Sequence, residues 1–244
     1  MSEIETLEDD LRIASKILEW EIGDIWGHVG VRLPGGSGIA VKLFRMPEEE
    51  DRQDWLVHFD YSLKKISGVG GIPREAAIYS EIFKARPDVN AATHCHAPMC
   101  TALSMANRQI TTVHMQSKQF ADGVPIYPKP IYIIDADEGR ELAQALGKAV
   151  AVVIRGHGIV TVGATIREAC FQALYLERTA KMLAVASMLG FEKAEPEFLQ
   201  LLNGSFKKLM AYQGRPEGRT AYDAEWRYYK NKVLKGEPWS RGWV

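Results

Sequence analysis

The sequence predicts a single α/β or α+β domain that spans residues 1–244 and is built around a mixed sheet. Segments with helical apolar spacing alternate with short β-prone runs, and no internal repeat or low-complexity linker divides the chain. Of the 244 residues, 46% are hydrophobic and 25% are charged, which is ordinary for a globular protein. Because a chain of this length can bury most of its apolar surface in one core, it needs no structural metal or disulfide to fold.

The first elements follow from apolar spacing and turn residues. We predict a helix over Leu7–Glu21, because apolar residues recur there every three or four positions and Thr6 with Asp9 resembles a capping box. A hairpin follows, in which the β-prone runs Val29–Leu33 and Ile39–Leu43 are joined by a Pro-Gly-Gly-Ser-Gly turn.

The remainder of the chain alternates helices and strands in an irregular order, which argues against a repeating strand–helix–strand fold. The helices are expected at 74–85, 98–105, 137–149, 165–190 and 196–212. The strands are expected at 91–96, 110–114, 150–154 and 159–162. A tail rich in aromatic and charged residues follows Gly214.

Composition excludes several classes of function. The formal net charge is −1 and no long basic or acidic run occurs, so we expect no binding to nucleic acid or to a membrane surface. No apolar stretch approaches the length of a transmembrane helix, and the acidic N-terminus does not resemble a signal peptide. The three cysteines form no Cys-x-x-Cys pair, which is typical of reduced thiols. We therefore expect a cytoplasmic protein that acts on a small molecule.

The strongest local signal is the run Thr93-His94-Cys95-His96. Because side chains alternate along a strand, His94 and His96 point to the same face and could hold one metal ion together. Taken alone, the pattern fits two surface histidines on an edge strand equally well.

A third histidine and a glutamate complete a candidate metal site. His157 lies between two glycines directly after the apolar run Val150–Ile154, where the backbone can turn sharply; its alternative role is that of a simple turn residue. Three histidines at strand ends fit an open catalytic metal site. Glu75, at the start of a predicted helix, could be a fourth ligand, an acid/base or only a favourable charge at the helix N-terminus.

These motifs, in this order and spacing, resemble the class II aldolase/adducin family. The resemblance covers about residues 11–189 and rests on Arg74-Glu75, on His94-Cys95-His96 after eighteen residues, on Arg155-Gly156-His157-Gly158 and on the run from Trp26 to Arg32. It implies a three-layer α/β/α fold around a largely antiparallel sheet, and a homotetramer with active sites between subunits.

The resemblance also implies roles for individual residues. It implies one divalent ion per chain (zinc, manganese, cobalt or iron), held by His94, His96 and His157, with Glu75 as the acid/base that can also touch the metal. The C-terminal tail, 214–244, is expected to pack on a neighbouring subunit, where Tyr222 could contact the substrate.

Two departures from the family's sugar-phosphate aldolases narrow the expected activity. The phosphate-holding serines before the glutamate are replaced by the run Gly71–Arg74, and Gly27-His28 stands where those aldolases have Gly-Asn. The chain is more similar to the branch that decarboxylates hydroxylated aromatic or pyridine dicarboxylates, which carries such a Gly-His and a Val-His like Val113-His114. It is therefore expected to be a metal-dependent lyase of aromatic compound catabolism.

In that reading, several polar residues could meet the substrate. His28 and His114 could bind its carboxylate or donate a proton. Arg32 and Arg74 could pair with a carboxylate, and both are equally suited to surface salt bridges.

Three alternatives stay open. The chain could be a class II aldolase for a small unphosphorylated hydroxy-acid or sugar-like substrate, or a non-heme iron oxygenase for an aromatic substrate, since imidazole suits several metals. It could also be a non-catalytic adducin-like interaction domain. The presence of Glu75 and the three histidines favours an enzyme.

Overall fold

The computed structural model describes residues 2–44, 55–211 and 221–236, and its central element is one eight-stranded sheet. The strands lie in the order β4-β3-β2-β1-β5-β8-β7-β6, and only β6 and β7 pair in parallel. Their bounds are β1 His28–Arg32, β2 Ile39–Leu43, β3 Leu56–Phe59, β4 Lys65–Gly68, β5 Ala91–Cys95, β6 Ile126–Tyr127, β7 Ala151–Ile154 and β8 Gly158–Gly163. The expected largely antiparallel mixed sheet is thus confirmed.

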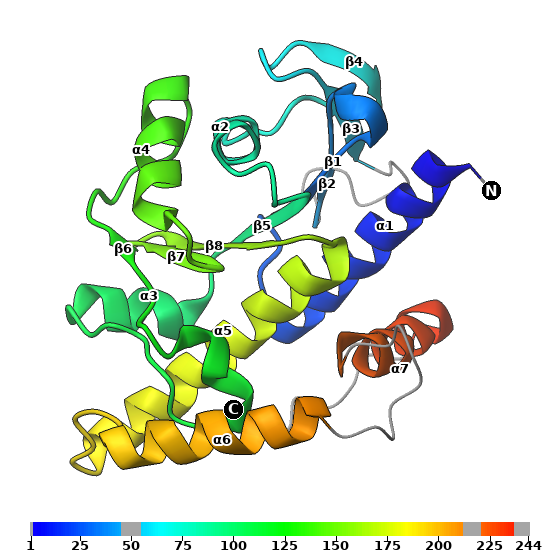
Figure 1. Ribbon diagram of the computed structural model, residues 1–244. Coiled ribbons are helices and arrows are strands. Elements are labelled where there is room, and N and C mark those ends of the chain that lie inside the picture. Colours follow the sequence, from blue (N-terminus) through cyan, green and yellow to red (C-terminus); the bar gives the residue numbers. More distant parts are fainter. Residues whose placement is uncertain (1, 45–54, 212–220, 237–244) are drawn as a thin grey trace.

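Helices cover both faces of the sheet (Figure 1). Their bounds are α1 Glu3–Ile22, α2 Ala77–Ala85, α3 Pro98–Met105, α4 Ala136–Leu146, α5 Ile166–Met188, α6 Pro196–Ala211 and α7 Ala221–Lys235. One hydrophobic core joins the sheet to α1, α3 and α5, and a second core joins the opposite face to α2 and α4. The three-layer α/β/α class is therefore confirmed.

Alternation along the strands divides residues between these two cores. In β5, Ala91 and Cys95 face α5, whereas Ala92 lies in the core with α2 and α4. His94 is two residues after Ala92 on the same strand, so both side chains are on the α2 side of the sheet.

Three helix starts differ from the prediction, and one of these helices, α2, begins at Ala77 and not at residue 74. Helix α1 begins at Glu3, because the Ser2 hydroxyl accepts the Glu5 N–H and the Glu5 carboxylate accepts the Ser2 N–H in a capping box. The Thr6 hydroxyl instead donates to the Ser2 carbonyl inside the helix. Helix α4 begins at Ala136 and not at residue 137, because Asp135 caps it. Thr165 caps α5 as predicted.

The predicted strand at 110–114 is wrong. This segment runs as irregular chain into a 3₁₀ helix, Met115–Phe120. The Thr112 hydroxyl donates to the Ser117 carbonyl, and the Ser117 hydroxyl accepts from the N–H groups of Val113 and His114. These side-chain bonds to the backbone satisfy groups that a strand would use in a ladder.

The sequence did not reveal β3, β4, β6 or α7. Helix α7 packs on α1 and α5 of its own chain, with the Tyr222 ring stacked on Phe171 at 5.8 Å. Residues 214–220 and 237–244 of the expected tail lie outside the described residues, so its packing on a neighbouring subunit stays a prediction. Among the described helices, none is long and apolar enough to span a membrane.

Candidate metal centre

Four side chains come together from the turn before α2, the end of β5 and the β7–β8 turn. One ligand atom from each of Glu75, His94, His96 and His157 lies within 4.8 Å of the others. The meeting is a result of strand register, because Cys95 pairs with Ile159 and the β7–β8 turn that carries His157 therefore lies beside the end of β5. The structure thus brings together all four residues predicted as metal ligands.

The hydrogen bonds of His94 and His157 leave the Nε2 atom of each ring available to a metal ion. His94 Nδ1 lies 3.0 Å from the Ile159 carbonyl oxygen, and His157 Nδ1 lies 2.8 Å from the Ile131 carbonyl oxygen. Since a carbonyl can only accept, each Nδ1 carries the proton and each Nε2 has a lone pair. Both Nε2 atoms are buried without a hydrogen-bond partner.

The carboxylate of Glu75 faces these lone pairs. Its Oε2 lies 3.3 Å from His94 Nε2 and 3.6 Å from His157 Nε2, while Oε1 accepts the Ile133 N–H at 2.9 Å. Burial raises the pKa of Glu75, but the His94 ring in its protonated form and the Ile133 N–H outweigh this and lower it to about 2. Buried, unpartnered imidazole nitrogens around an ionised carboxylate fit a divalent metal ion.

Asp24, which sequence reasoning missed, holds the third histidine. Its Oδ2 accepts the His96 backbone N–H at 2.8 Å and lies 3.0 Å from His96 Nδ1, while Oδ1 accepts the Trp26 N–H at 2.9 Å. A carboxylate behind a metal-binding histidine fixes its tautomer and raises its basicity. Burial raises the pKa of Asp24, but the bonds from His96 outweigh it and give about 2.

Two glycines allow the backbone to place Asp24 beside His96. Gly23 ends α1 in the left-handed conformation at φ 78°, which turns the chain toward the sheet. A Cβ at Gly27 would lie 2.9 Å from Asp24 Oδ2 and 2.4 Å from the Phe44 ring. In the sequence, the glycine before His28 was the one sign that the chain packs closely here. No spacing pattern linked Asp24 to His96.

His28 lies beside the cluster. It pairs with His94 across β1 and β5, and the two ring centroids are 5.2 Å apart. Its Nδ1 lies 2.6 Å from the hydroxyl of Tyr79, a buried residue of α2 that the sequence did not single out. Burial, and then the neighbouring His94, lower the pKa of His28 to about 3.

The remaining predicted residues are not in the cluster. His114 Nε2 lies 3.1 Å from the Thr179 hydroxyl of α5. Arg32, at the opposite end of β1 from His28, donates to the carbonyls of Phe83, Arg86 and Val89 at the end of α2.

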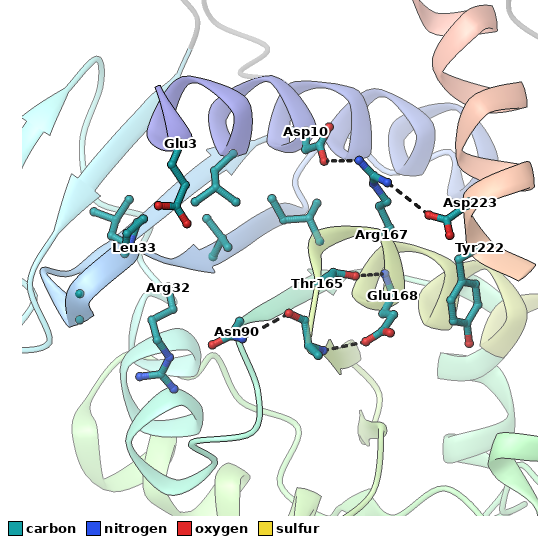
Figure 2. Close-up of a pocket in the computed structure, with 17 residues that line it drawn as sticks. Glu3, Asp10, Arg32, Leu33, Asn90, Thr165, Arg167, Glu168, Tyr222 and Asp223 are labelled. Atoms are coloured by element: carbon teal, nitrogen blue, oxygen red, sulfur yellow. Dashed lines mark hydrogen bonds and ion pairs between the residues drawn. The ribbon is translucent and has the colours of Figure 1, made fainter. Parts of the chain in front are cut away.

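Arg32 and Tyr222 line a different cavity of about 560 Å³, between α1, the β1–β2 turn and the start of α5 (Figure 2). There Arg167 is paired with both Asp10 and Asp223. Arg74, by contrast, is exposed directly beside Glu75.

The cluster opens onto a small hollow of about 220 Å³. It is lined by His96 and His157 together with Pro130, Ile131, Tyr132 and Gly156. The Tyr132 ring meets the His157 ring edge to face at 5.2 Å and is 65% exposed. An aromatic wall therefore stands next to the metal-binding nitrogens.

Comparison with known proteins agrees with this geometry. Residues 20–184 match the family model described as Class II Aldolase and Adducin N-terminal domain. The chain belongs to this family. The structure of an aldolase II superfamily protein from Pseudomonas syringae superposes on this class II aldolase-family chain with a TM-score of 0.78 at 20% identity, over 97% of this chain and 95% of that one.

Two curated relatives have different printed activities. The chain is 28% identical over 208 residues to the 3,4-dihydroxyphthalate decarboxylase of Arthrobacter keyseri, covering 78% of this chain and 83% of that protein. It is 27% identical over 158 residues to the L-fuculose phosphate aldolase of Escherichia coli (strain K12), covering 64% and 71%. Membership of this class II aldolase family therefore supports an enzyme of the lyase type, and the similarity alone does not choose between the two activities.

Proposed function

We propose that this protein is a divalent-metal-dependent decarboxylase of a hydroxylated aromatic or related carboxylic acid. The observation that carries the proposal is that two members of the Glu75–histidine cluster, His96 and His157, line a hollow that the Tyr132 ring also lines. The hollow suits a single aromatic ring in size, and the segment before Glu75 offers no serine to hold a phosphate. The similarity to a dihydroxyphthalate decarboxylase points the same way.

Different residues of the chain would bind the metal, orient a ligand and contact the substrate. His94, His96, His157 and Glu75 would hold the metal, with Asp24 orienting His96. When bound, a divalent metal supplies Lewis acidity that stabilises negative charge on a substrate oxygen as the carbon–carbon bond breaks. The exposed Arg74 guanidinium lies next to Glu75 in sequence and could pair with a second carboxylate of the acid. The Tyr132 ring would pack on the substrate ring and exclude water.

The test is a carbon-dioxide release screen with metal-loaded protein over hydroxylated aromatic and pyridine carboxylates. Glu75→Gln is the control, because it keeps size but removes a positioned acid/base, which costs roughly a hundredfold to ten-thousandfold in rate. We expect release by the wild type and at least about a hundredfold slower release by Glu75→Gln at equal metal content. Cleavage of a sugar phosphate in strong preference to its dephosphorylated form would instead establish the aldolase alternative, and oxygen uptake would establish an oxygenase.

A further inference from the structure

The hydrogen bonds of Tyr79 determine where the proton of His28 lies. The Tyr79 hydroxyl is 2.9 Å from the His28 carbonyl oxygen and 2.6 Å from His28 Nδ1. A carbonyl can only accept, so the single hydroxyl proton of Tyr79 points to it. His28 Nδ1 must then carry a proton and donate it to the Tyr79 oxygen. In the opposite arrangement, two buried oxygens would face each other at 2.9 Å with no proton between them, which is costly.

Packing holds this pair in place. Tyr79 is fully buried, and its ring lies on β1 in the space that a side chain at residue 30 would fill: a Cβ on Gly30 would lie 2.4 Å from the ring. Because Gly30 has no side chain, the Tyr79 ring can pack directly on this strand. The hydroxyl cannot move away from His28 without displacing α2 from the sheet.

The second ring nitrogen of His28 is consequently an acceptor. With Nδ1 protonated, the neutral ring has a lone pair on Nε2. Among the described residues, no side chain or backbone group hydrogen-bonds to Nε2. His28 is on the same face of the sheet as His94, directly opposite it in the ladder. The lone pair is therefore available beside the metal ligands and not at a remote surface.

We propose that Tyr79 is a positioning residue that holds His28 in the Nδ1-protonated tautomer, so that Nε2 accepts a hydrogen bond from a hydroxyl group of the substrate. This rests on the proposed function and deepens it, because it specifies an acid with a hydroxyl group near the carboxylate that leaves. The proton stays on the substrate oxygen, and the hydrogen bond orients the hydroxyl group beside the four clustered residues.

The same geometry argues against a carboxylate as the partner of neutral His28. A carboxylate offers only acceptors, and two acceptors do not form a hydrogen bond. The substrate's carboxylate groups would therefore be bound elsewhere.

The first test is the tautomer itself, which can be read without any turnover. Long-range ¹H–¹⁵N correlation spectra of Zn²⁺-loaded, ¹⁵N-histidine-labelled protein distinguish a protonated Nδ1 from a protonated Nε2, and His28→Gln identifies the His28 signal. We expect a protonated Nδ1 in the wild type and in Tyr127→Phe, a buried tyrosine whose hydroxyl donates instead to Glu141. Tyr79→Phe should shift the equilibrium toward a protonated Nε2. A protonated Nε2 in the wild type would overturn the proposal.

The second test uses catechol as a probe of the hydroxyl acceptor. Binding of catechol to the Zn²⁺-loaded protein should weaken at least about tenfold in Tyr79→Phe, since a hydrogen bond of about 1.4 kcal/mol corresponds to that factor. Metal content and the Tyr127→Phe control should be unchanged. Equal catechol affinity in Tyr79→Phe would reject the role of Nε2.

The two proposals can fail separately. If no acid releases carbon dioxide but the tautomer and catechol results hold, the proposed reaction fails and the assignment of Tyr79 stands. If an acid is decarboxylated at the wild-type rate by Tyr79→Phe, the reaction stands and the assignment of Tyr79 fails.

Discussion

At the scale of single residues, Asp24 determines how His96 can serve as a ligand. One carboxylate oxygen accepts both the backbone N–H and the ring N–H of His96, so backbone position and ring tautomer are fixed together. Asp24→Asn should weaken this, because its amide cannot accept all three N–H groups that Asp24 now satisfies. We expect metal affinity to fall about tenfold to a hundredfold, measured by competition with a chelator.

Asp88→Asn is the matched control for this prediction. Asp88 is exposed and bonded to Arg86 of its own loop, away from the cluster. Metal affinity should therefore stay at the wild-type value. If Asp24→Asn binds metal as tightly as this control does, the His96 ring is oriented by packing alone.

At the scale of elements, the contact of α2 with β1 positions Glu75. Glu75 lies in the turn directly before α2, and Tyr79 of α2 packs on the strand at Gly30. The position of the helix therefore sets the position of the carboxylate. Gly30→Ala would place a Cβ 2.4 Å from the Tyr79 ring and force α2 away. We expect thermal unfolding to show a loss of about 1–3 kcal/mol, as is typical of overpacked cores, together with weaker metal binding.

Gly71→Ala provides the comparison for Gly30→Ala. Gly71 lies in the same approach to α2, and a Cβ there would meet no atom within 4 Å. This variant should unfold and bind metal like the wild type. A Gly30→Ala protein with wild-type stability would show that the α2–β1 contact can relax without cost.

At the scale of the whole molecule, we expect a homotetramer, as the family resemblance implies. Large apolar side chains are exposed along the last turns of α5, among them Met188 and Leu189 at 84% each. Exposed apolar surface of this kind is typical of association sites. Light scattering of the purified protein should give about four times the chain mass of 27.3 kDa. A monomer with full activity and full metal content would contradict this expectation.

The sequence by itself predicted the four residues that cluster in the structure, and the strongest helices. Alternation along a strand placed His94 and His96 on one face, and the glycines around His157 marked a sharp turn, because both features depend on a few neighbouring residues. The start and end of α3 and the cap of α5 followed from local signals in the same way. At residues 110–114 two local signals competed: the run is β-prone, but its hydroxyl groups can bond to the backbone. The hydroxyl bonds formed, and the run is not a strand.

Only the tertiary structure decided which groups orient those ligands. Asp24 and His96 are 72 residues apart, and His28 and Tyr79 are 51 residues apart, so no local pattern joins them. It also separated Arg32 and Tyr222 from the cluster and assigned them to a second cavity. The physical reason is that a hydrogen bond between distant residues exists only after the sheet has set the register of its strands, whereas alternation and turns are present in the chain before it folds.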